Sequence, residues 1–226
     1  MLLSGCLYPQ SKFNHEQAPN EDQLELVQMA VDNYRKQNNG LVPIKTKPAD
    51  TPIFEKYLID FNILTDNHYL SSIPSNSFEQ GGIYQYILIT PEENPRVRLL
   101  DLRLAEELRK VNGKLNEYRS KYLYPPFGQE VARGIYTIDY EKLGLKHEPY
   151  VVSPYSHENL PLIMSTDGKI YIDYRIDLLK ALNEFDHQFV EGDDIRYLIA
   201  ENTPFVPAYS LPYTIQNDEP IFMYEP

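Results

Sequence analysis

The chain has 226 residues, of which 42% are hydrophobic and 24% charged, enough for one large or two small domains built around a hydrophobic core. Its 33 acidic and 21 basic residues give a net charge of −12, so a nucleic-acid backbone would repel the body and nucleic acid is not expected as a partner. The single cysteine excludes an intrachain disulfide, and the sequence has no run of about 18 apolar residues that could form a transmembrane helix.

The start of the chain reads Leu3-Ser4-Gly5-Cys6, and Cys6 is the only cysteine. This run resembles the lipobox of bacterial lipoproteins, and more broadly the membrane-anchored lipoproteins of Gram-positive bacteria. The resemblance implies cleavage before Cys6, a diacylglycerol on its sulfur, and a body held on the extracytoplasmic face of the cell membrane by two acyl chains. Residues 1–5 lack a charged start and a full apolar stretch, so we expect them to be the remnant of a signal peptide. Otherwise Cys6 is a small hydrophobic residue near a frayed terminus.

Residues 6–20 are polar and show little periodicity, as expected of a lipidated tether. A first helix is predicted after them, with Asp22 and Glu25 as a capping box. We expect Asn38-Asn39-Gly40 to end this helix. Its apolar residues recur at steps of three and four: Leu24, Val27, Val31 and Tyr34.

Residues 51–61 leave two alternatives open. Thr51-Pro52 can begin a short helix that includes Phe54, or the segment can run extended through Tyr57–Phe61, and periodicity does not decide between them. Further on, Gly81-Gly82 is a turn signal. Residues 83–90 are rich in Ile and Tyr, which predicts a strand buried on both faces.

A second helix is the clearest element of the sequence. Its apolar residues step by 4, 3, 4 and 3 positions: Leu104, Leu108, Val111, Leu115 and Tyr118. Asp101 is the expected N-cap, and Pro125-Pro126 lies beyond the end. A stripe of this length is typical of a helix packed on its own sheet, although a seam for a partner helix has the same pattern.

After the second helix, the order of the elements repeats. Tyr57–Phe61 resembles Tyr136–Tyr140, 79 positions later (136 − 57), and Gly82 corresponds to Gly168, 86 positions later (168 − 82). A third Ile-Asp-Tyr, at residues 172–174, falls in the last strand of the second unit instead of the first. The pattern is therefore typical either of an internal duplication or of a common way to end a strand.

These elements predict an α+β fold: two helix-strand-strand-strand units with antiparallel or mixed sheets, possibly an internal duplication. The first unit is expected at residues 21–100 and the second at residues 101–226. Asp193-Asp194 is expected to begin a short helix. The C-terminal tail, which includes Thr203–Pro207, should lie extended along the body, as an edge strand broken by prolines.

Catalytic and cofactor motifs are not found in the sequence, which has no His-Glu-x-x-His spacing, no Gly-x-Ser-x-Gly elbow and no glycine-rich phosphate loop. We therefore predict no catalytic residue, no metal and no cofactor. The best remaining constellation is His147-Glu148 with His157-Glu158, ten residues apart. If this segment doubled back, two imidazoles and two carboxylates would suit zinc or general acid and base catalysis; otherwise these are chance dipeptides on polar loops.

The sequence thus predicts a membrane-anchored, extracytoplasmic lipoprotein that is not an enzyme and that binds an envelope protein or a small-molecule ligand. Two alternatives are left open. A solute-binding lipoprotein of an ABC transporter would have two lobes and a cleft, and an envelope enzyme acting on peptidoglycan or polysaccharide would have paired carboxylates in a tyrosine-lined groove. The 19 tyrosines suit half-exposed sheets or a platform that stacks on sugars.

Overall fold

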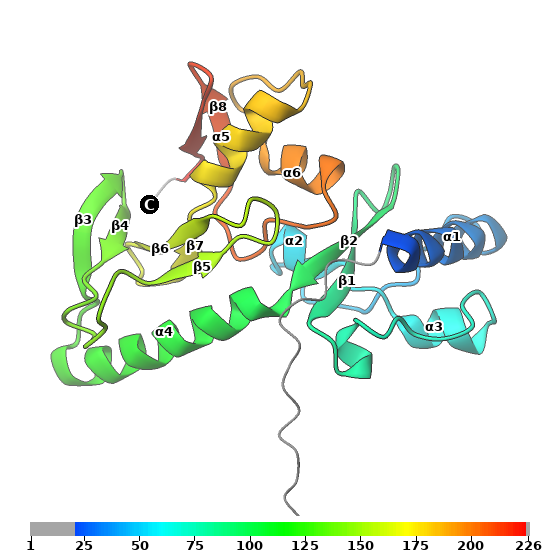
Figure 1. The fold of residues 1–226 in the computed structure, drawn as a ribbon, viewed down its shortest axis with the longest axis horizontal. Helices are drawn as coiled ribbons and strands as arrows, with labels where there is room; N and C mark the ends of the chain where they lie inside the picture. Colours follow the sequence, from blue (N-terminus) through cyan, green and yellow to red (C-terminus); the bar gives the residue numbers. More distant parts are fainter. Residues whose placement is uncertain (1–20, 225–226) are drawn as a thin grey trace, which may run out of the picture.

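A computed structural model describes residues 21–224, in which helices and antiparallel sheets alternate along the chain (Figure 1). Every pairing between two named strands within this range is antiparallel. The predicted α+β class is therefore confirmed, with sheets of the antiparallel kind.

The N-terminal part consists of helices followed by a β-hairpin. Its elements are α1 (Glu21–Gln37), α2 (Ile53–Lys56), α3 (Phe61–Asp66), the 3-10 helix η1 (Phe78–Gln80), β1 (Tyr84–Ile89) and β2 (Arg96–Asp101). The helix α1 ends just before Asn38-Asn39-Gly40, as predicted, but Asp22 already lies in its first turn and so does not cap it. Of the two alternatives for residues 51–61, the short helix is present as α2.

The β1–β2 hairpin is extended on both edges by short segments. On the β1 side, the Ile59 N–H donates to the Tyr86 carbonyl at 2.9 Å, but this pairing stops because α3 begins at Phe61. On the β2 side, the Leu99 N–H donates to the Pro204 carbonyl at 2.8 Å. The predicted match of Tyr57–Phe61 with a full strand is therefore wrong, and the first unit is not a helix followed by three strands.

The second part begins with the long helix α4 (Leu102–Tyr122) and a five-stranded sheet. The strands are β3 (Phe127–Ala132), β4 (Ile135–Ile138), β5 (Tyr150–Val152), β6 (Asn159–Ser165) and β7 (Ile170–Ile172). β6 is central: β4 pairs with residues 163–165, β5 with residues 159–161, and β7 with residues 162–164. The remaining elements are α5 (Arg175–Glu184), α6 (Arg196–Asn202), β8 (Tyr213–Gln216) and β9 (Glu219–Phe222).

The apolar stripe of α4 packs on this sheet. Every predicted member is buried: Leu104, Leu108, Val111, Leu115 and Tyr118. They share one cluster with Val151 of β5, Ile172 of β7 and Leu178 of α5, which confirms the core-face interpretation. Asp101 caps α4 as predicted, since its carboxylate accepts the Arg103 N–H at 2.9 Å.

The C-terminal tail joins the two parts. Pro204–Val206 runs extended beside β2, as expected of an edge strand between prolines, whereas residues 213–222 form the β8–β9 hairpin. One buried cluster contains residues of both parts: Phe54, Leu58, Ile87, Ile89 and Leu100 with Ala200, Val206 and Ala208. The core of the first part is therefore completed by the end of the chain, and a boundary at residue 101 divides a shared core.

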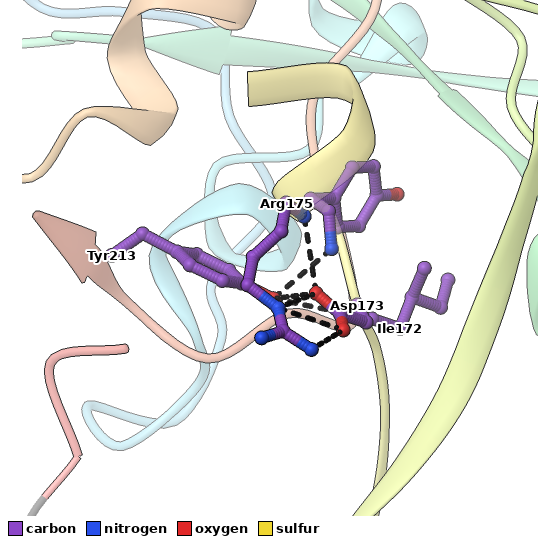
Figure 2. A network of polar contacts seen from close by, with 5 residues as sticks. Ile172, Asp173, Arg175 and Tyr213 are labelled. Atoms are coloured by element: carbon purple, nitrogen blue, oxygen red, sulfur yellow. Dashed lines mark hydrogen bonds and ion pairs between the residues drawn. The ribbon is translucent and has the colours of Figure 1, made fainter. Parts of the chain in front are cut away.

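Three helices begin with the same Asp-x-Arg arrangement. At α5, the Asp173 carboxylate accepts the Arg175 backbone N–H at 3.0 Å and binds the Arg175 guanidinium at 2.6 Å (Figure 2). The Tyr213 hydroxyl also donates to Asp173, at 3.3 Å. Equivalent contacts join Asp101 to Arg103 at α4 and Asp194 to Arg196 at α6. In each case one aspartate accepts the backbone N–H of the arginine two positions later and pairs with its guanidinium. Only Asp101 is itself the N-cap, because the N-cap residues of α5 and α6 are Tyr174 and Ile195.

Candidate functional site

The predicted lipidation site, Cys6, lies outside the described residues together with the lipobox and the whole of the tether at residues 6–20. Among residues 21–224, no helix combines the length and the apolar character needed to cross a membrane. The anchor therefore stays a prediction.

The two His-Glu pairs lie at opposite ends of β5. His147-Glu148 precedes the strand, and His157-Glu158 ends the turn that leads from β5 into β6. β5 itself has three residues and spans about 10 Å. His147 makes a 2.9 Å bond from its Nδ1 to the Glu148 carbonyl, and His157 has a left-handed backbone with φ of 62°. Across the described part of the chain, no cluster of three or more His, Cys, Asp or Glu residues could hold a metal ion.

The turn that contains His157 is held by a buried carboxylate. Asp177 of α5 accepts hydrogen bonds from the Ser153 hydroxyl at 2.6 Å and from the Ser156 hydroxyl. Ser153 Oγ in turn accepts the Tyr155 and Ser156 N–H groups. Burial raises the pKa of Asp177 above its usual value, while the two serine hydroxyls oppose that shift. These contacts fix the turn, and each Asp177 oxygen accepts one serine hydroxyl.

A groove of about 580 Å³ lies between α4 and the segment that leads into β5, at the His147 end. One wall is a single face of α4: Glu107, Lys110, Val111 and Lys114. The other wall is formed by residues 144–147 and by β5, which lies beside α4 in Figure 1. Val111 and Val151 give the groove an apolar floor that is continuous with the main core.

The strand β5 turns one hydrogen-bonding edge away from β6. Leu162 N–H donates to the Pro149 carbonyl and Ser153 N–H to the Glu158 carbonyl, each at 2.9 Å. Because paired and unpaired positions alternate in an antiparallel ladder, the N–H and C=O groups of Tyr150 and Val152 point away from β6. No backbone hydrogen bond joins these two residues to a described residue outside the β5–β6 pair. Their side chains are 40% and 55% exposed.

The rim of the groove is basic, although the chain as a whole is acidic. Lys110 and Lys114 lie on α4 and Lys146 lies on the opposite wall. Lys110 pairs with Glu107 at 2.7 Å and with Glu106 at 3.3 Å. For Lys114 and Lys146, no ion pair with a carboxylate is present within the described range. The groove therefore offers positive charge beside an apolar floor on a chain of net charge −12.

A separate aromatic cluster lies at the C-terminal end of α4. The rings of Tyr118 and Tyr122 are 4.5 Å apart, and those of Tyr118 and Tyr124 are 5.9 Å apart. Leu123 between them is 91% exposed and has a left-handed backbone. Tyr122 and Tyr124 are also exposed, so two of the three rings face solvent, as a stacking platform would require.

The comparison with known protein families finds a match in the first part of the chain. Residues 20–101 match the model of the YphF family N-terminal domain. No curated protein and no solved structure matches the chain. The matched segment ends at Asp101, the cap of α4, so the groove lies entirely outside it.

The sequence indicates the buried face of α4 but not the groove beside it. The lysines of the wall carry a detectable signal, because Lys110 and Lys114 are four positions apart and border the apolar stripe on one side. The free edge of β5 has no such signal. This edge is free because β5 pairs with β6 and with no other described strand, and the pairing of strands does not follow from the local spacing of residues.

Proposed function

We propose that this protein is a lipoprotein anchored to the outer face of the cell membrane that binds a ligand in the groove between α4 and β5. The anchor rests on Leu3–Cys6 and on the polar residues that follow. The observation that carries the binding role is the groove, because it joins an apolar floor, basic side chains and unused backbone hydrogen-bonding groups in one place. Such a combination of apolar surface with a few polar groups is typical of ligand sites.

The anchor is tested by cell fractionation. Expressed behind a complete lipoprotein signal sequence, the wild-type protein should be found in the membrane fraction, with a mass that includes the lipid. Cys6→Ala should release the protein into the medium or leave an unprocessed precursor. Membrane association and mass that do not depend on Cys6 would rule the anchor out.

The binding role is tested by photo-crosslinking in intact cells. A benzophenone amino acid placed at Val152, on the groove edge, should yield an adduct of discrete mass. The matched control is Leu179 on α5, which is also exposed but lies outside the groove lining. No adduct at Val152, or the same adducts at both positions, would show that the groove holds no specific ligand.

A further inference from the structure

We infer that the groove binds an extended acidic peptide, which adds as a strand to the free edge of β5. This inference rests on the proposed function and names the ligand class. It also commits to a protein ligand, where the sequence left an envelope protein and a small molecule open.

The backbone geometry favours an extended peptide. Tyr150 and Val152 together present two N–H and two C=O groups on the side of β5 opposite β6. A strand placed there can satisfy all four with a segment of about five residues. Short length is one way in which proteins protect an open strand edge, and here it also limits how much of a partner can pair.

The side chains around that edge can contact alternate residues of such a peptide in different ways. Successive side chains of an added strand point to opposite faces. One set would face the floor, made by Val111 and Val151, and the other would lie beside Tyr150 and Val152, which are exposed. Apolar residues suit the floor, and this alternation gives the groove a preference for sequence pattern in addition to backbone shape.

Charge selects the acidic class. Lys114 and Lys146 line the groove, and neither forms an ion pair within the described range, whereas Lys110 is paired with Glu106 and Glu107. The rest of the chain is strongly negative, so an acidic peptide gains attraction at the groove alone and is repelled elsewhere. A basic peptide would be drawn to the body in general and would meet like charge at this rim.

The probe is a seven-residue peptide of alternating glutamate and valine with blocked termini, titrated into the full chain carrying Cys6→Ala. We expect saturable binding with a Kd below about 1 mM, and NMR shifts at the Tyr150 and Val152 amides. Two further peptides carry N-methyl groups on alternate residues, one on the odd and one on the even positions. Each lacks the N–H donors of one strand face, so the pair distinguishes backbone pairing from charge attraction alone. At least one should bind at least tenfold more weakly, and the lysine version of the peptide should not bind.

Substitutions in the protein test the same contacts as the changes in the peptide. Val152→Pro removes an outward N–H that β6 does not use and should weaken binding about three- to tenfold. Lys114→Glu and Lys146→Glu should each weaken it about two- to fivefold, with a smaller loss at high salt. Lys36→Glu on α1 makes the same change in net charge far from the groove and should leave the affinity unchanged.

The outcomes separate this inference from the proposed function. If the acidic peptide does not bind but the crosslink at Val152 is present in cells, the groove binds a ligand of another class and the inference is wrong. If the N-methylated or lysine peptides bind as well as the acidic one, strand addition is likewise excluded. If both the crosslink and peptide binding are absent, the proposed function fails as well.

Discussion

Two segments of the molecule consist of a β-hairpin followed by a helix, and they differ in the length of that helix. In one, the β1–β2 hairpin leads through Asp101 into α4; in the other, the β6–β7 hairpin leads through Asp173 into α5. The two aspartates are 72 positions apart (173 − 101). Yet α4 has 21 residues and α5 has 10. The same aspartate-arginine contact thus lies at the start of each helix, although Asp101 is the N-cap of α4 and Asp173 comes just before Tyr174, the N-cap of α5. The surface available for packing sets how far each helix continues.

The first prediction tests whether the two helices share one core. Leu115 of α4 and Leu178 of α5 are both buried in the same cluster. Each change to alanine should lower the free energy of unfolding by about 2–5 kcal/mol, and thermal unfolding followed by calorimetry should keep a single transition in both variants. Leu123→Ala, at an exposed site, should cost less than about 0.5 kcal/mol. Two separate transitions, with only one moved by Leu178→Ala, would show independent units.

A second prediction compares Asp101 and Asp173 directly. Asp101→Ala and Asp173→Ala each remove the acceptor of an arginine backbone N–H and the partner of its guanidinium, at a cost of about 1–2 kcal/mol. The loss at Asp173 should be larger by about 1 kcal/mol, because the Tyr213 hydroxyl, which is buried, also loses a partner there (Figure 2). Denaturant unfolding measures both.

The amide variants Asp101→Asn and Asp173→Asn serve as controls for these contacts. Each keeps an oxygen that can accept the N–H of the arginine two positions later, so each should recover part of the lost stability. Equal losses for the alanine variants at the two sites would mean that Tyr213 adds nothing to the contacts of Asp173.

A third prediction concerns the aspartate-arginine pair at α6, in which the arginine is more buried than the aspartate, the opposite of the pair at α5. The Arg196 side chain is 9% exposed, against 38% for Arg175. Arg196 also bonds to the Ser210 carbonyl at 3.3 Å and lies 5.0 Å from the Phe54 ring centroid. Lysine cannot make this forked and stacked set of contacts. We expect Arg196→Lys to cost about 1–2 kcal/mol and Arg175→Lys less than about 1 kcal/mol, and similar values would rule out the special role of Arg196.

The sequence predicts those features of the fold that depend on local spacing. The stripe of α4, its Asp101 cap and the strand at residues 84–89 follow from periodicity and capping, and all are present. The predicted repeat compares Tyr57–Phe61 with Tyr136–Tyr140, but the first of these segments is not a full strand, because α3 begins at Phe61. Aligning Asp173 with Asp101 requires knowing that both lie at the end of the second strand of a hairpin.

Features that depend on long-range contact could not be predicted. The pairing of Pro204 with β2 joins residues more than 100 positions apart, and the groove beside β5 exists only because α4 crosses the sheet there. The sequence points to the His-Glu pairs as the candidate site, and of these only His147 lines the groove. Polar dipeptides stand out in a sequence, whereas a strand edge is made of backbone and leaves no mark in side-chain composition.

The last and smallest predicted effect is a pH dependence of stability that arises at the start of α5, where Asp177 lies buried one turn beyond Asp173. α4 has an alanine at the equivalent position, Ala105, so this charge distinguishes the two units. Burial raises the pKa of Asp177 in the folded protein above its usual value, with Glu158 acting in the same direction and Ser153, Ser156 and Lys180 opposing it. A raised folded pKa means that the folded state takes up the proton first. The stabilising contribution is therefore complete below the pKa of about 3.9 that an aspartate has in an unfolded chain, and it is lost as the pH rises through the folded pKa.

Asp177→Asn removes this titration while keeping an oxygen that can accept one serine hydroxyl. Measured as thermal midpoints between about pH 3.5 and 7.5, the wild type should gain stability relative to Asp177→Asn as the pH falls. Leu179→Ala, which changes an exposed residue of the same helix and no titratable group, should keep the wild-type pH dependence throughout. A wild type that loses stability relative to Asp177→Asn on acidification would mean that the hydrogen bonds from Ser153 and Ser156 outweigh burial and that the pKa is lowered. The turn would then stabilise the ionised Asp177 carboxylate. The difference between α4 and α5 would lie in these hydrogen bonds and not in the desolvation of Asp177.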